Sequence, residues 1–67
     1  MAVVINGQDV SLPEDVHTIN DLLGFYQLQE KMAVVEHNQT IMKKNNYEKS
    51  YIQDGDKIEI VHFVGGG

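Results

Sequence analysis

The chain has 67 residues, of which 42% are hydrophobic, and it contains no cysteine. This length allows a single domain with a small core and leaves little room for the deep pocket of a self-contained enzyme. The net charge is −5 and every cationic side chain is a lysine, so the chain repels polyanions and lacks the arginine fork that grips phosphate. This charge disfavours nucleic acid as a partner and suits a basic protein surface. The lack of cysteine excludes disulfides, a thiolate metal site and a thiol nucleophile.

The N-terminal residues predict a β-hairpin. Residues 2–6 are rich in β-branched side chains, and Asn6-Gly7 favours a type I′ turn, which needs positive φ at both central positions. Residues 8–12 then form the return strand. The apolar stretch of residues 1–5 is too short for a signal peptide or a membrane span, so we expect a cytoplasmic protein without a membrane partner.

A helix is predicted to begin after Thr18. The hydroxyl of this residue suits an N-cap, and Asp21 three positions later gives an imperfect capping box. Apolar side chains recur at helical spacing and predict a helix face that is buried on a sheet: Ile19, Leu22, Leu23, Tyr26 and Leu28. Tyr26 is therefore expected to be part of the core. Gly24 costs this helix up to about 1 kcal/mol relative to alanine, and we attribute it to close packing.

The second half of the chain predicts further strands. Residues 33–37 form a strand, and residues 40–42 form a short one. Residues 43–51 are either irregular or contain a single helical turn. A turn over residues 53–56 leads into the final strand, residues 57–64. This order predicts an α+β fold, with one main helix packed on one face of a mixed sheet of four to five strands.

The final strand carries apolar side chains on both faces. Isoleucines alternate with polar residues and mark the inward face: Ile58 and Ile60 between Lys57, Glu59 and His62. Val61 and Phe63 fall on the opposite face, where a merely solvated strand would carry polar residues. Together with Val34 they predict an exposed apolar patch that docks partners. A bulge that turns Val61 or Phe63 inward would produce the same pattern, and the sequence leaves both interpretations open.

The remaining polar and aromatic side chains predict structural roles. The histidines lie far apart and not at metal-ligand spacing, so we expect no metal site: His17, His37 and His62. Tyr47 and Tyr51 are expected to cover the loop beneath them. Lys44 is expected to be an ordinary exposed lysine.

The last three residues, Gly65-Gly66-Gly67, directly follow an apolar strand. A glycine tail presents a single functional group, the terminal carboxylate of Gly67, and it can thread a narrow channel into another protein's active site. A frayed end is the alternative, because termini are often disordered. The strand before the tail favours the functional interpretation.

The order of the elements resembles the β-grasp, or ubiquitin-like, fold, and in particular its members whose C-terminal Gly-Gly is chemically activated. Within that group the chain is most similar to the sulfur carrier proteins of thiamin thiazole synthesis. The resemblance covers essentially the whole chain and rests on four segments: Ile5-Asn6-Gly7, Thr18-Ile19-Asn20-Asp21-Leu22-Leu23, Val34-Val35-Glu36-His37-Asn38 and residues 54–67. The chain departs from the family at Lys43-Lys44, where Pro-Arg is frequent, and at Tyr47, where tryptophan is frequent.

The resemblance implies a single β-grasp domain over residues 1–64 and a flexible tail over residues 65–67. It implies a protein co-substrate rather than an enzyme, with no cofactor bound to the chain itself. A ubiquitin-activating-like enzyme would adenylate Gly67 with ATP and Mg²⁺. A cysteine desulfurase or another persulfide donor would then convert it into a thiocarboxylate that a thiazole synthase uses.

The residues themselves predict roles around the terminus. Gly65 and Gly66 would thread the partner's active site, because they lack side chains. The predicted docking surface on the folded domain comprises Val34, Val61, Phe63 and Val64. Other functions stay open for a chain of this kind, namely the small subunit of a molybdopterin synthase, a carrier for another sulfur pathway, a ubiquitin-like modifier that is joined to lysines, and a β-grasp binding module with an incidental tail.

Overall fold

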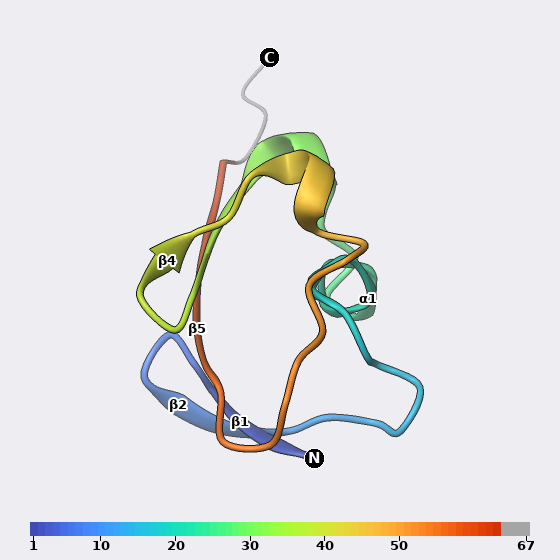
Figure 1. The fold of residues 1–67 in the computed structure, drawn as a ribbon, viewed down its shortest axis with the longest axis vertical. Helices are drawn as coiled ribbons and strands as arrows, with labels where there is room; N and C mark the ends of the chain where they lie inside the picture. Colours follow the sequence, from blue (N-terminus) through green and yellow to red (C-terminus); the bar gives the residue numbers. More distant parts are fainter. Residues whose placement is uncertain (64–67) are drawn as a thin grey trace.

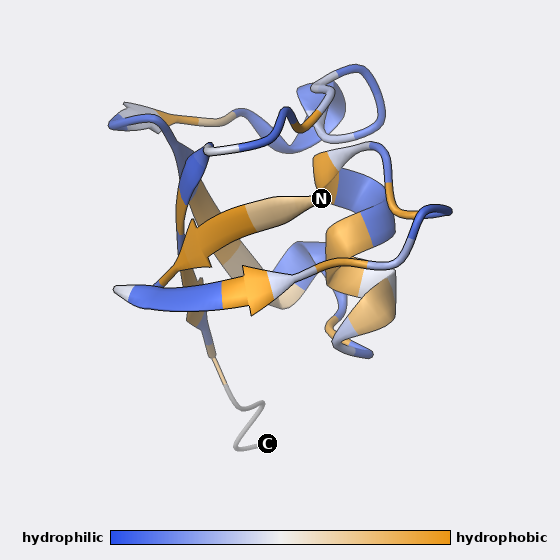
Figure 2. Cartoon of the chain, turned by 90° about the horizontal axis from the view of Figure 1, so that it is seen from below, coloured by the Kyte–Doolittle hydropathy of each residue, from blue (hydrophilic) through white to orange (hydrophobic). Residues whose placement is uncertain are grey.

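A computed structural model describes residues 1–63 of the chain. The described residues form five strands and three helices: β1 (Ala2–Ile5), β2 (Gln8–Ser11), α1 (Ile19–Phe25), η1 (Glu30–Met32), β3 (Ala33–His37), β4 (Thr40–Ile41), η2 (Lys44–Asn46) and β5 (Lys57–His62). The strands make one mixed sheet in the order β2-β1-β5-β3-β4, in which β1 and β5 run parallel. The helix α1 lies on one face of this sheet (Figures 1 and 2), which confirms the predicted fold class.

The predicted hairpin is present between β1 and β2. Asn6 and Gly7 have φ values of 50° and 81°, as a type I′ turn requires, and the pairing runs from Ala2↔Ser11 to Ile5↔Gln8. Glycine adopts this conformation without strain and asparagine tolerates it, so the dipeptide itself specifies the turn.

The predicted capping box starts α1. The Thr18 side chain accepts a hydrogen bond from the Asp21 N–H (3.1 Å), and the Asp21 carboxylate accepts from the backbone N–H groups of His17 (3.0 Å) and Thr18 (3.2 Å). Hydrogen bonds from these two N–H groups hold the pKa of the Asp21 carboxyl below its ordinary value. The cap therefore satisfies donors at the helix start that would otherwise lack a partner.

The core lies between α1 and the inner face of the sheet. Its buried side chains come from every part of the described chain: Val3, Ile5, Leu12, Val16, Ile19, Leu22, Leu23, Ala33, Val35, Tyr47, Ile52 and Ile58. The apolar residues predicted for the helix are in this list, apart from Leu28, which packs against it, and Tyr26.

Two tyrosines differ from their predicted roles. Tyr26 is 38% exposed rather than part of the core, and it follows α1 directly, which ends at Phe25. Tyr47 is 1% exposed and belongs to the core, where its hydroxyl donates to the Ala33 carbonyl (3.2 Å). Burial raises the pKa of this phenol. Tyr51 is exposed on the surface of the loop.

Lys44 is exposed, as predicted, but its side chain is also held by backbone carbonyls. Its Nζ donates to the carbonyls of Glu30 (2.9 Å), Lys31 (3.3 Å) and Ala33 (2.9 Å). These carbonyls lie at the end of η1, where a cation is favoured because the last helical carbonyls have no partner within the helix. Lys44 thus ties η2 to the start of β3.

The turn before β5 is organised by Asp56. Its carboxylate accepts hydrogen bonds from His37 Nε2 (2.6 Å), Asn38 Nδ2 (3.1 Å) and the Gln53 N–H (2.8 Å). Burial alone would raise the pKa of Asp56, but these hydrogen bonds outweigh it and hold the pKa below its ordinary value. The carboxylate thereby joins the end of β3 to the start of β5.

None of the helices formed by residues 1–63 has the length and apolar character needed to span a membrane.

The structure corrects the interpretation of Gly24 and yields a stability prediction. A β-carbon added there would meet no neighbour within 4 Å, so close packing does not require glycine. We expect Gly24→Ala to raise the free energy of unfolding by up to about 1 kcal/mol, because alanine loses less backbone entropy in a helix. Gly55→Ala is the matched control and should destabilise, since Gly55 has a φ of 88°. Urea unfolding measures both, and no gain for Gly24→Ala would contradict this explanation.

The Asp56 network predicts a specific acid sensitivity. The pKa of Asp56 is lower in the folded state, so its ionised carboxylate contributes to the free energy of unfolding. This contribution is fully present above the unfolded pKa of about 3.9 and is lost as the pH falls through the folded pKa. Asp56→Asn should lower the free energy of unfolding at pH 6 and flatten its decline in acid. Urea unfolding at several pH values checks this. An equally steep decline in the variant would assign the acid sensitivity to other carboxylates.

Candidate partner-binding site

The end of β5 displays the predicted apolar patch. The ladder between β3 and β5 runs without a break from His37↔Ile58 to Ala33↔His62, so the sheet has no bulge that turns Val61 inward. Val34 and Val61 lie directly opposite each other and are 38% and 55% exposed. Phe63 is 55% exposed, and its N–H donates to the Met32 carbonyl (2.7 Å). The prediction of an exposed patch is therefore confirmed for Val34, Val61 and Phe63.

Acidic side chains border this patch on the same face of the sheet. Glu36 and Glu59 are opposite each other in the ladder, two residues along each strand from Val34 and Val61, and so on the same face. Both are half-buried. Within residues 1–63 the ion pair that forms joins His37 to Asp56, so neither Glu36 nor Glu59 is paired with a cation there. Two like charges placed directly opposite are unfavourable unless a cation approaches. The surface therefore suits a partner that is both apolar and basic.

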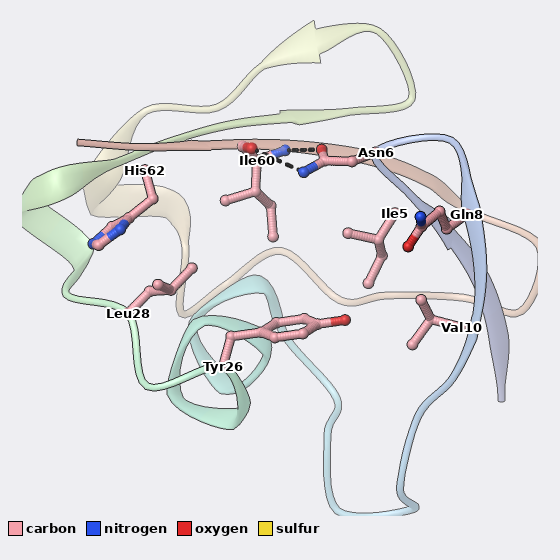
Figure 3. A pocket seen from close by; sticks show the side chains of 8 residues that line it. All are labelled: Ile5, Asn6, Gln8, Val10, Tyr26, Leu28, Ile60 and His62. Atoms are coloured by element: carbon pink, nitrogen blue, oxygen red, sulfur yellow. Dashed lines mark hydrogen bonds between the residues drawn. The ribbon is translucent and has the colours of Figure 1, made fainter. Parts of the chain in front are cut away.

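The helix side of β5 carries a groove that the sequence did not reveal. Its volume is about 260 Å³, and it is lined by Ile5, Asn6, Gln8, Val10, Tyr26, Leu28, Ile60 and His62. Figure 3 shows the Tyr26 ring lying across the groove beneath Ile60 and Ile5. The partial exposure of Tyr26 is thus explained, because its ring forms one wall of an open surface feature.

His62 points toward this groove and not toward the outer face (Figure 3). The sequence interpretation that places His62 with Lys57 and Glu59 is wrong, because His62 is an even number of residues from Ile58 and Ile60 and so shares their face. Among the residues that the structure describes, no group of histidines and carboxylates could hold a metal ion, and His37 is occupied by Asp56.

Asn6 fixes the strand at the groove. Its Oδ1 accepts from the Ile60 N–H (2.7 Å), and its Nδ2 donates to the Ile60 carbonyl (3.1 Å), as the dashed lines in Figure 3 show. The side chain thus occupies the place of a neighbouring strand at Ile60. The Asn-Gly signal identifies Asn6 as a turn residue, but nothing in the sequence connects it to a residue 54 positions away.

The remaining predicted site residues lie outside the described part of the chain. These are Val64, Gly65, Gly66 and Gly67. Their roles as a docking residue, a threading tail and the site of activation stay predictions.

Comparisons with known proteins agree on one family. The family model for the ThiS family matches residues 3–67. The sulfur carrier protein ThiS of Bacillus subtilis is 51% identical over 63 residues, which cover 94% of this chain and 96% of that protein. A thiazole synthase of Paramagnetospirillum magneticum is 39% identical over all 67 residues, although they cover only 20% of its length.

Solved structures give the same result. The crystal structure of the thiamine biosynthesis protein ThiS from Geobacter metallireducens superimposes with a TM-score of 0.82 at 25% identity, and the match covers the whole of both chains. Sequence and fold therefore lead to a single conclusion. The chain belongs to the ThiS family of sulfur carrier proteins.

Proposed function

We propose that this protein is the sulfur carrier for the thiazole of thiamin and that it carries the sulfur as a thiocarboxylate on Gly67. The observation that supports this most is the 51% identity to a sulfur carrier protein across nearly the full length of both chains. The family match also extends through the glycines to residue 67. Among the sulfur pathways open to a carrier, the similarity to thiazole synthases favours thiazole formation.

The proposed chemistry requires the carboxylate to be activated, because a carboxylate is a poor electrophile. An adenylating enzyme uses ATP and Mg²⁺ to join the Gly67 carboxylate to AMP, with release of pyrophosphate. The terminal sulfur of a persulfide donor, such as a cysteine desulfurase, attacks the acyl carbon and displaces AMP. A thiol then reduces the resulting S–S bond and leaves the thiocarboxylate. Because the activation consumes ATP, we place it in the cytoplasm.

The protein acts in this scheme as a co-substrate and not as an enzyme. Each bond is made or broken at Gly67 by groups that other proteins supply. Gly65 and Gly66 lack side chains and so allow the terminus to enter a narrow active site. The chain has no cysteine, so no internal thiol competes for the activated acyl group.

The folded domain contributes the docking surface. Val34, Val61 and Phe63 are exposed apolar side chains at the end of the strand that leads into the tail. We propose that the adenylating enzyme covers this patch, with Val64 at its margin, and places a basic side chain against Glu36 and Glu59. Burial of apolar side chains gives affinity, while the charge pairing selects the partner.

The carrier chemistry is tested by the intact mass of the protein purified from its own cells. We expect a fraction that is heavier by the exchange of one oxygen for sulfur, and fragmentation should place the change at Gly67. Removal of Gly66 and Gly67 should abolish the heavier species. If only the plain carboxylate is found, even after incubation with ATP, an adenylating enzyme and a persulfide donor, the proposal fails. Conjugates to lysine would instead indicate a protein modifier.

The docking patch is tested with Val61→Asp. A carboxylate in the centre of the patch should lower kcat/KM for adenylation at least about tenfold, because it must be desolvated when the partner binds. The fold should persist, since Val61 faces solvent. Ser11→Asp adds the same charge on the exposed edge strand β2 and should leave adenylation near the wild-type rate. Unfolding of Val61→Asp, or equal effects of both variants, would argue against the patch.

A further inference from the structure

The last part of β5 has one paired edge and one open edge. On one side, β3 accompanies β5 as far as Ala33↔His62. On the other side, β1 pairs only through Val4↔Lys57 and Ile5↔Ile58, and the chain then turns away at Asn6-Gly7. Beyond Ile58, the hairpin no longer covers this edge with a strand.

The direction of the hydrogen bonds identifies which groups face the open edge. The Val4 and Asn6 N–H groups donate to the carbonyls of Asp56 and Ile58 (both 2.9 Å), and Asn6 binds both backbone groups of Ile60. Alternate residues of a strand direct their N–H and C=O groups to the same edge. The N–H and C=O of His62 therefore point to the β1 side, where no strand of residues 1–63 pairs with them.

Neighbouring residues support this assignment. The Phe63 N–H donates to Met32, which immediately precedes β3, so odd-numbered residues at this end of β5 point the other way. Asn6 imitates a neighbouring strand at Ile60 and goes no further. A free strand edge of this kind is a template for pairing with another extended chain.

The groove lies directly beside this edge. Tyr26, Leu28, Val10 and Ile60 form its apolar wall and His62 stands at its end (Figure 3). A strand added to β5 would direct alternate side chains toward the helix side and toward the outer face. One side chain would enter the groove, while the next would lie beside Val61. The edge and the groove thus fit a single ligand.

We propose that an extended segment of a thiazole synthase adds to this edge as a short strand and seats an apolar side chain in the groove. Two relatives that are thiazole synthases match all 67 residues over 20% of their own length, so a domain similar to this chain belongs to the same polypeptide. The segment pairs with His62 by backbone hydrogen bonds, which is a known mode of peptide recognition. This inference rests on the proposed function and names where that partner binds.

The proposal is tested by titrating the full-length chain with the thiazole synthase from the same cells. His62→Pro removes the N–H that faces the open edge while leaving the bonds to β3 in place, and proline is tolerated at strand edges. We expect the affinity of the His62→Pro variant for the synthase to fall at least tenfold. His62→Ala keeps the N–H and should lose less than threefold. Wild-type affinity of His62→Pro, or an equal loss with His62→Ala, would overturn the proposal.

Amide hydrogen exchange gives a second test that needs no variant. The His62 amide should exchange rapidly in the free protein and at least a hundredfold more slowly in the complex. A complex that leaves this amide unprotected would overturn the proposal, as would a self-associated form of the chain that protects it without the synthase. The binding experiment uses the plain carboxylate protein. A failure here is therefore distinct from a failure to find the thiocarboxylate.

Discussion

The position of β5 in the sheet is the constraint on which the rest of the structure depends. The last strand of the sequence lies between β1 and β3, at the centre of the order β2-β1-β5-β3-β4. Ile58 is completely buried there beneath α1. Within the sheet, β5 is the strand that joins the hairpin β1-β2 to the pair β3-β4. The segment that leads into the tail is consequently held by the whole fold.

Three polar side chains hold β5 and its surroundings in place by binding backbone groups. Asn6 takes the place of a strand at Ile60, Asp56 joins the turn before β5 to the end of β3, and Lys44 closes the last turn of η1. Backbone groups near the surface must find partners, and in a sheet of short strands side chains supply them. Each bond is modest by itself, but together they tie β5 and β3 to the turns and loops around them.

This arrangement gives the end of β5 two different surfaces. The outer face presents an apolar patch bordered by Glu36 and Glu59, and the opposite side presents a groove beside an unpaired strand edge. A carrier has to be recognised in turn by the enzyme that loads it and by the enzyme that unloads it. Two surfaces at the base of one tail allow each partner its own contacts while both reach the same terminus.

Local patterns determined much of the fold without any structure. The Asn6-Gly7 turn, the Thr18 cap, the strands and the alternation that exposes Val61 depend on residues a few positions apart, and each is present. Tertiary structure alone decided the burial of Tyr47, the three carbonyl contacts of Lys44, the open space at Gly24 and the groove beside His62. These features depend on how segments that are distant in sequence are placed relative to one another, and the order of strands in the sheet sets part of that placement. A local pattern carries no information about that order.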